Sequence, residues 1–177
     1  MSERQRGDAL TDELVAELGR ANDIGRAFGC LEQLKSNQDA LAADAPPVFL
    51  AWLSEARVIP AWARPERLLR AQRWADRNLV LLVTGLFCAS LPSTYAAARG
   101  ARVVYDTGRL RGDVDRRVHE TGAFVLDVLR PEGFAPGGRA AVAACRVRWI
   151  HAVVRHRLTS AGRVDETPIN QEDLVGT

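Results

Sequence analysis

Apolar residues recur along the chain at the three- and four-residue spacing of an α-helix, in segments with recognisable ends. The first expected helix starts at Thr11, a good N-cap, and carries its apolar residues between positions 14 and 18. A second helix is expected over residues 23–34. Pro46-Pro47 begins a third, because proline is tolerated in the first turn of a helix. The pattern predicts an all-α fold.

The next helix is expected to run from Pro65 to Ser90, with a charged first part and an almost wholly apolar second part. A helix that is apolar on every side is normally buried on every side, and we expect this of residues 79–91. The β-branched residues of LVLLV leave a central strand as the competing interpretation, although the length favours a helix. The stretch is shorter than the roughly 20 residues that span a bilayer, so no transmembrane segment is predicted.

The remaining periodic segments predict helices over 92–98, 113–129 and 139–158, of which the last is the strongest. Pro168 and Asn170 mark the start of another helix, with Glu172 and Asp173 suited to its first turn. No internal repeat is present. Because 177 residues suit one domain, we expect a single all-helical domain over 1–177.

Charge and cysteine content exclude several classes of protein. The net charge of +2 gives no global field for nucleic acid, and the arginines of residues 139–163 do not share one helical stripe. The 3 cysteines show no C-x-x-C spacing, so neither a disulfide framework nor a zinc site is expected. The polar amino terminus lacks the apolar core of a secretory signal, which predicts a cytoplasmic location.

Candidate chemistry lies in the helix over 139–158, where Arg148 and Arg155 flank His151 on one stripe. A neutral imidazole is a good iron ligand, and arginine forks suit the propionates of a haem. The spacing alone leaves a surface histidine as the more common interpretation. Similarly, Arg117 and Thr121 face the same way on the preceding helix, where a solvated charged face is the ordinary interpretation.

Three motifs in combination carry a resemblance: R-x-x-x-T at 117–121, R-x-x-H-x-x-x-R-H at 148–156, and PINQED at 168–173. Together, over about residues 95–177, they resemble the oxygenase family that includes rubber oxygenases (latex clearing proteins) and MpaB-type relatives. The resemblance implies a globin-like helical core that holds haem b. It also implies that the chain stops after PINQED, without the family's C-terminal helices.

Site residues follow from the same resemblance. The family's proximal iron ligand falls on His151, and its haem-holding neighbours fall on Arg148, Arg155 and His156. Its distal arginine and threonine fall on Arg117 and Thr121. Some rubber-cleaving members place a lysine immediately before that threonine, where it can occupy the sixth iron position. This chain has Glu120 there, a candidate base by position alone.

The implied activity is O₂-dependent cleavage of an alkene in a small isoprenoid or lipid-like substrate. The alternative is a catalytically inactive helical fragment or interaction module without haem. If residues 1–177 are the whole product, half of the haem pocket is missing, and we expect exposed apolar faces that self-associate or pair with a complementing C-terminal chain.

Overall fold

The computed structural model describes residues 7–40, 44–96, 101–103, 114–162 and 168–169, and every regular element within these ranges is helical. The prediction of an all-α fold is confirmed. The competing interpretation of LVLLV as a strand is wrong, since these residues form the first turns of a helix. The helix expected from Asn170 onward lies outside the described residues.

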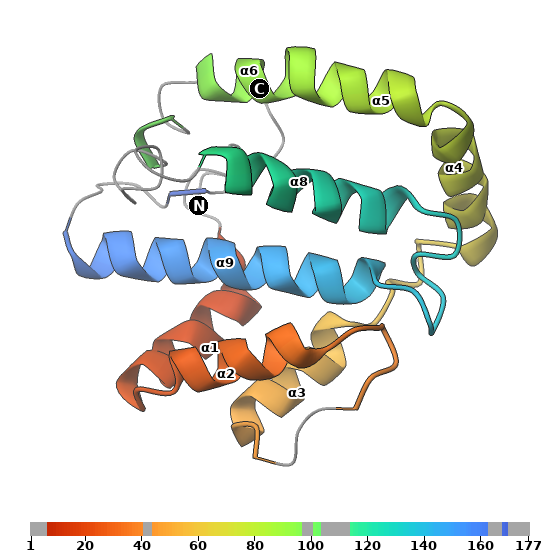
Figure 1. Ribbon diagram of the computed structural model, residues 1–177. Helices are drawn as coiled ribbons and strands as arrows, with labels where there is room; N and C mark the ends of the chain where they lie inside the picture. Colours follow the sequence, from red (N-terminus) through yellow and green to blue (C-terminus); the bar gives the residue numbers. More distant parts are fainter. Residues whose placement is uncertain (1–6, 41–43, 97–100, 104–113, 163–167, 170–177) are drawn as a thin grey trace.

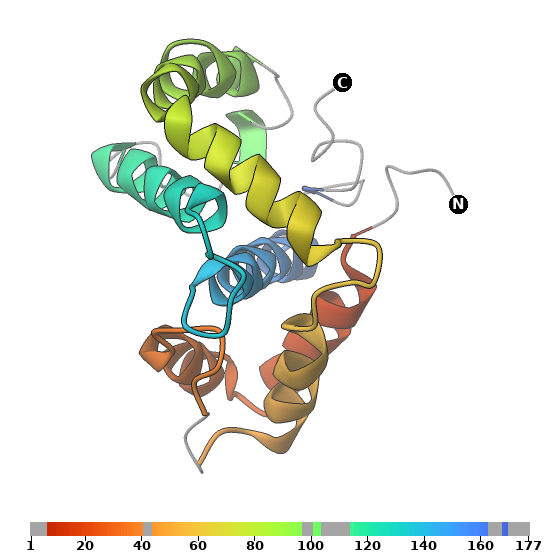
Figure 2. The ribbon, with the colours of Figure 1, turned by 90° about the vertical axis from the view of Figure 1, so that its right-hand side faces the viewer.

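Helix α9 (Ala140–Ser160) runs through the middle of the molecule. Figures 1 and 2 show α1, α2 and α3 on one side of it and α8 on the other, with α5 and α6 beyond α8. The bounds on the first side are α1 (Ala9–Arg20), α2 (Ile24–Gln33) and α3 (Pro47–Ala56). Both α2 and α3 begin where their sequence signals predicted.

The start of α1 differs from the prediction. Asp8 caps the helix, and its side chain accepts a hydrogen bond of 3.3 Å from the backbone N–H of Thr11. Thr11 therefore lies inside the first turn, where it is fully buried. A carboxylate and a hydroxyl are both good caps. Asp8 holds the position because the apolar stripe of α1 begins with Thr11 already turned toward the core.

Three aromatic side chains form the centre of the core between α3 and α9. The ring of Trp149 meets Phe49 edge-on at 5.7 Å and lies 6.0 Å from Trp52. The indole Nε1 of Trp52 donates to Thr11 Oγ1 at 3.1 Å, so the polar atom of this ring has a partner although it is buried. Apolar residues of α1 and α2, among them Val15, pack around this cluster.

The helix predicted over 65–90 is bent. The structure has α4 (Pro65–Arg77), α5 (Leu79–Gly85), the π-helical turn η2 (Leu86–Ser90) and α6 (Leu91–Ala96). The chain turns by 83° at Asn78, between Pro65–Arg77 and Leu79–Ser93. The Asn78 side chain donates to the carbonyl of Trp74 at 2.8 Å, a local bond that competes with continuation of the helix.

Burial of the apolar stretch was predicted wrongly. None of the α5 residues is buried, and Val80 and Leu81 are 81% and 70% exposed. Cys88 of η2 is exposed, whereas Cys30 and Cys145 are buried. Within the described ranges no single helix is long and apolar enough to cross a membrane, and the bent pair of α4 with Leu79–Ser93 meets that test by length and composition only.

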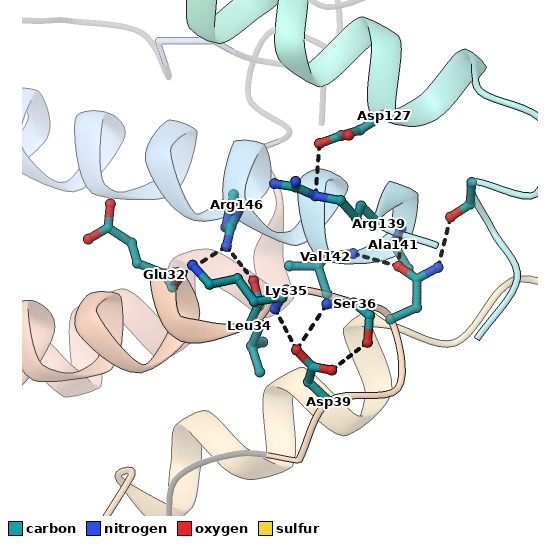
Figure 3. A network of polar contacts seen from close by, with 12 residues as sticks. Glu32, Leu34, Lys35, Ser36, Asp39, Asp127, Arg139, Ala141, Val142 and Arg146 are labelled. Carbon is teal, nitrogen blue, oxygen red and sulfur yellow. Dashed lines mark hydrogen bonds and ion pairs between the residues drawn. The ribbon is translucent and has the colours of Figure 1, made fainter. Parts of the chain in front are cut away.

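The start of α9 is held by a side chain from a distant loop. Asn37 Oδ1 accepts from the backbone N–H groups of Ala141 and Val142 at 3.0 and 3.3 Å. Its Nδ2 donates to the carbonyls of Gly133 and Ala135 in the loop that joins α8 (Val114–Leu129) to α9. Figure 3 shows Ala141 and Val142 in this polar network. One amide thus fixes both α9 and the α8–α9 connection.

Candidate functional site

His151 lies in the middle of α9, on the side away from the aromatic core. It belongs to a stripe with Val147 and Val154, at the three- and four-residue steps of one helical face. Trp149 and Ala152 point the other way, into the core cluster. Helix α8 packs along α9, and the His151 side chain is half-buried. The imidazole therefore has Val147 and Val154 one turn away on either side, with Arg148 and Arg155 next to these valines.

The environment keeps this imidazole neutral. Burial and, to a lesser extent, the positive charge of Arg155 together lower the pKa of His151 to about 4, although the charge of Asp8 acts in the opposite direction. None of the described residues forms a hydrogen bond with either ring nitrogen. A neutral imidazole with an available lone pair is the form that binds a metal ion.

Arg148 pairs with α1. Its Nε donates to Asp8 Oδ2 at 2.6 Å, and its Nη2 donates to Asp8 Oδ1 at 2.9 Å, a two-pronged contact. Burial acts to raise the pKa of Asp8, but hydrogen bonds from Arg148 and Thr11 outweigh it and hold that pKa below its usual value. Asp8 therefore both caps α1 and binds α9.

Arg155 makes a second connection, one helical turn further along α1. Only 4% of this residue is exposed. Its Nε donates to Asp12 Oδ1 at 2.8 Å, and Nη2 lies at the same distance from that oxygen. Nη1 donates to the backbone carbonyl of Ile169 at 3.0 Å. Arg155 thus joins α1, α9 and the segment after α9 through one guanidinium group.

His156 also faces α1. A Cβ atom placed on Gly19 would lie 3.0 Å from His156 Nε2, so the ring packs against the bare backbone of that glycine. The structure therefore brings His156, Arg148 and Arg155 to one neighbour, α1. In the part of the chain that the structure describes, no such contact with α1 joins His151, whose side chain lies on the side of α9 away from the aromatic core.

The predicted distal residues lie on α8. Thr121 is half-buried, and its neighbour Gly122 packs against η2, where an added Cβ would stand 3.3 Å from Phe87 Cζ. Glu120 is exposed and accepts from Arg116 Nε at 2.8 Å. Arg117 belongs to α8, but its side chain lies outside the described part of the structure. No hydrogen bond joins Thr121 to His151 within that part.

Sequence reasoning did not identify Asp8 and Asp12. Both are acidic residues in or next to the first turn of a helix, where carboxylates are common for local reasons. Asp8 and Asp12 are one helical turn apart, whereas their partners Arg148 and Arg155 are seven residues apart on α9. The pairing becomes apparent only once α1 and α9 are known to pack together. No signal in the sequence alone paired them.

A metal ion at this place would have few protein ligands. Within the described ranges, no group of three or more His, Cys, Asp or Glu residues is arranged to hold one. A haem needs only an axial ligand from the protein, since the porphyrin supplies the other four nitrogens. His151, neutral and half-buried, is a candidate for such a ligand.

Sequence comparison and structure comparison find similarity to a rubber oxygenase and to latex clearing protein, respectively. The chain is 25% identical over 182 aligned residues to the "Rubber oxygenase" of Streptomyces sp. (strain K30), an alignment that includes 96% of this chain and 43% of that protein. No family model matches the chain. The predicted resemblance to rubber oxygenases is confirmed.

A solved structure of latex clearing protein in its closed state superposes with a TM-score of 0.83 at 22% identity, covering 98% of this chain and 48% of that chain. The match establishes the all-α fold. The chain spans less than half the length of both relatives.

Proposed function

We propose that the chain provides the haem-ligand half of a haem-b-dependent oxygenase, with His151 as the axial iron ligand. The observation that carries this proposal is the neutral, half-buried imidazole in the middle of α9, with Val147 and Val154 one turn away on either side. The similarity to a rubber oxygenase supports oxygenase chemistry for the protein as a whole.

The residues present fit a haem in one respect and not in another. His151 has the neutral protonation state that an axial ligand requires. Arg148 and Arg155, predicted as propionate partners, already have carboxylate partners in Asp8 and Asp12. We therefore assign them to holding α9 in place, and we do not route propionate binding through them.

Each remaining side chain would have a limited task around the cofactor. A bound haem would supply O₂ binding and the redox chemistry of alkene cleavage. Val147 and Val154, on either side of His151, would exclude water from the ligand side. Thr121, which lies on α8, would offer its hydroxyl group as a hydrogen-bond donor to a polar ligand. Roles for Arg117 and Glu120 stay predictions from the family motif.

In the proposed reaction one C=C bond is cleaved and each of its carbons receives one atom of O₂. The products are two carbonyl groups, and the reaction consumes no external reductant. The substrate class is a small hydrophobic alkene of the isoprenoid or lipid type. The test is incubation of the haem-loaded chain with a short isoprenoid alkene under ¹⁸O₂. We expect cleaved carbonyl products with ¹⁸O in both fragments, and Thr121→Val should slow their formation.

Two controls make the assay decisive. The same mixture without O₂ should give no product, and free haem at equal concentration should give only background. A loaded wild-type chain that leaves a series of isoprenoid alkenes intact under ¹⁸O₂ would contradict the proposed reaction, although not the assignment of His151 as ligand.

One observation favours a second candidate, an interaction module without haem. The exposed side chains of Val80 and Leu81 give α5 an apolar outer face. The core face of α9 is buried by α1 to α3 and is not available for association. Light scattering on the haem-free chain tests this candidate: a dimer that becomes a monomer in Leu81→Glu would support it.

A further inference from the structure

Two carboxylates of α1 each engage one of the arginines that flank His151. Asp8 and Asp12 are one helical turn apart, and Arg148 and Arg155 lie two turns apart on α9. The contacts are 2.6 and 2.9 Å for Arg148 with Asp8 and 2.8 Å for Arg155 with Asp12. His151 stands between the two arginines along the helix axis.

The burial of these pairs makes them suitable for fixing geometry. Side-chain exposure is 5% for Arg155 and 32% for Asp12, and 34% and 20% for Arg148 and Asp8. Partly buried ion pairs are screened less than fully exposed pairs, and a guanidinium held at two atoms has a fixed orientation. The pairs therefore restrain the rotation and the sliding of α9 against α1, on both sides of His151.

We propose that Asp8 and Asp12 are positioning residues for His151, acting through Arg148 and Arg155. This role rests on the proposed function. It assigns the two arginines to ion pairs between α9 and α1 instead of to haem propionates. The ion pairs do not hydrogen-bond His151; they fix the placement of its helix, and the precision with which a ligand is held affects metal affinity. The carbonyl of Ile169, bound by Arg155, extends the same restraint to the segment after α9.

The two roles for the arginines predict different mutant patterns. If Arg148 binds a propionate, Arg148→Gln weakens haem binding whereas Asp8→Asn leaves it unchanged or strengthens it by freeing the arginine. If Arg148 and Asp8 act as one positioning unit, each single variant has the same effect and the double variant is no worse than either. Asparagine retains the helix-capping ability of Asp8, so this variant removes the charge and keeps the cap.

The experiment measures haem transfer from the loaded chain to an excess of apomyoglobin for wild type, Asp8→Asn, Arg148→Gln and the double variant, and for the corresponding Asp12→Asn and Arg155→Gln set. We expect each single variant to weaken haem retention by about tenfold to a hundredfold. We also expect non-additive doubles and altered low-spin ferric signals in electron paramagnetic resonance. Glu13→Gln, an exposed carboxylate of the same helical turn, is the matched control and should retain haem like wild type.

Urea unfolding of the haem-free variants separates positioning from general stability. Asn37→Ala, which loosens the other end of α9 without touching either ion pair, serves as the stability-matched comparison. Equal haem loss in Asn37→Ala and Asp12→Asn at equal urea midpoints would overturn the positioning role. So would haem loss in the arginine variants alone. A wild-type chain that takes up no haem would instead contradict the proposed function itself.

Discussion

The indole Nε1 of Trp52 donates a buried hydrogen bond of 3.1 Å to the hydroxyl of Thr11, which in turn donates to Asp8 Oδ2 at 2.8 Å. This chain of donors runs from the aromatic core to the carboxylate that binds Arg148. The core and the candidate site are therefore connected through one hydroxyl group on α1.

Replacement of Thr11 by valine should lower the free energy of unfolding by about 1–3 kcal/mol, because the buried indole N–H loses its acceptor while the side-chain shape is kept. Chemical denaturation followed by circular dichroism measures the effect. Thr11→Ser keeps the hydroxyl and should lie closer to wild type than Thr11→Val. Equal stability of valine and threonine at this position would show that the hydrogen bond contributes nothing.

Truncation of Trp149 should destabilise the fold far more than truncation of the exposed Trp62. Trp149 is 2% exposed and contacts both Phe49 and Trp52. Trp149→Ala should cost about 3–5 kcal/mol of unfolding free energy, since truncation leaves a large cavity between α3 and α9. Trp62, which is 79% exposed, supplies the matched control, and Trp62→Ala should change stability by less than about 1 kcal/mol. Similar losses in the two variants would contradict the described core.

Asn37 should stabilise α9 far more than a loop residue normally does. Asn37→Ala removes two acceptor contacts to the start of α9 and two donor contacts to the preceding loop. The expected loss is about 2–3 kcal/mol, because backbone groups at a helix N-terminus lose their cap. Thermal unfolding measures it. Gln38→Ala, the exposed neighbour, is the control, and a loss as large as that of Asn37→Ala would refute the capping role.

Asp39 gives the chain a specific dependence on pH. The hydroxyl of Ser36 and the backbone N–H groups of Lys35 and Ser36 donate to its carboxylate and lower its pKa below the usual 3.8. Figure 3 shows Ser36 and Asp39 within the polar network. A carboxyl whose folded pKa is depressed stabilises the fold above its unfolded pKa and loses this effect as pH falls through the folded value.

Wild type should therefore exceed Asp39→Asn in stability at pH 6, and the difference should shrink progressively below pH of about 3.8. Urea midpoints at several pH values measure the difference. Gln33→Ala, a non-titrating change on the exposed end of α2, should show an offset that does not vary with pH. A difference between wild type and Asp39→Asn that grows on acidification would have the wrong sign for this account.

The start of a helix was predictable from the sequence where the residue that marks it lies in the first turn of that helix. Pro47 begins α3 and Pro65 begins α4, as the tolerance of proline in a first turn requires. The start of α1 was misplaced because Asp8 and Thr11 are both acceptable caps, and only packing of Thr11 against Trp52 decides between them. The bend at Asn78 was missed because helical periodicity continues across it, with only an asparagine amide to mark the break.

Sequence reasoning singled out His151 as a candidate ligand, and this assignment stays a prediction, but it did not find the residues that support its helix. His151 was singled out by the family motif, and its apolar neighbours follow from the helical repeat. The partners of Arg148 and Arg155 are 140 and 143 residues away in sequence, so they depend on which helices pack together. Exposure of α5 was likewise unpredictable, because apolar composition indicates that a surface needs a partner without showing whether the described chain supplies one.

The most direct test of the account is the absorption spectrum of the chain produced with a haem precursor, beside His151→Ala and His119→Ala. The account predicts a Soret band with about one haem per chain in wild type, kept in the His119 variant because that exposed residue lies off the proposed site. In His151→Ala the band should be lost or shifted. A colourless wild type, or a band unchanged by removal of His151, would contradict the assignment of His151 as the iron ligand.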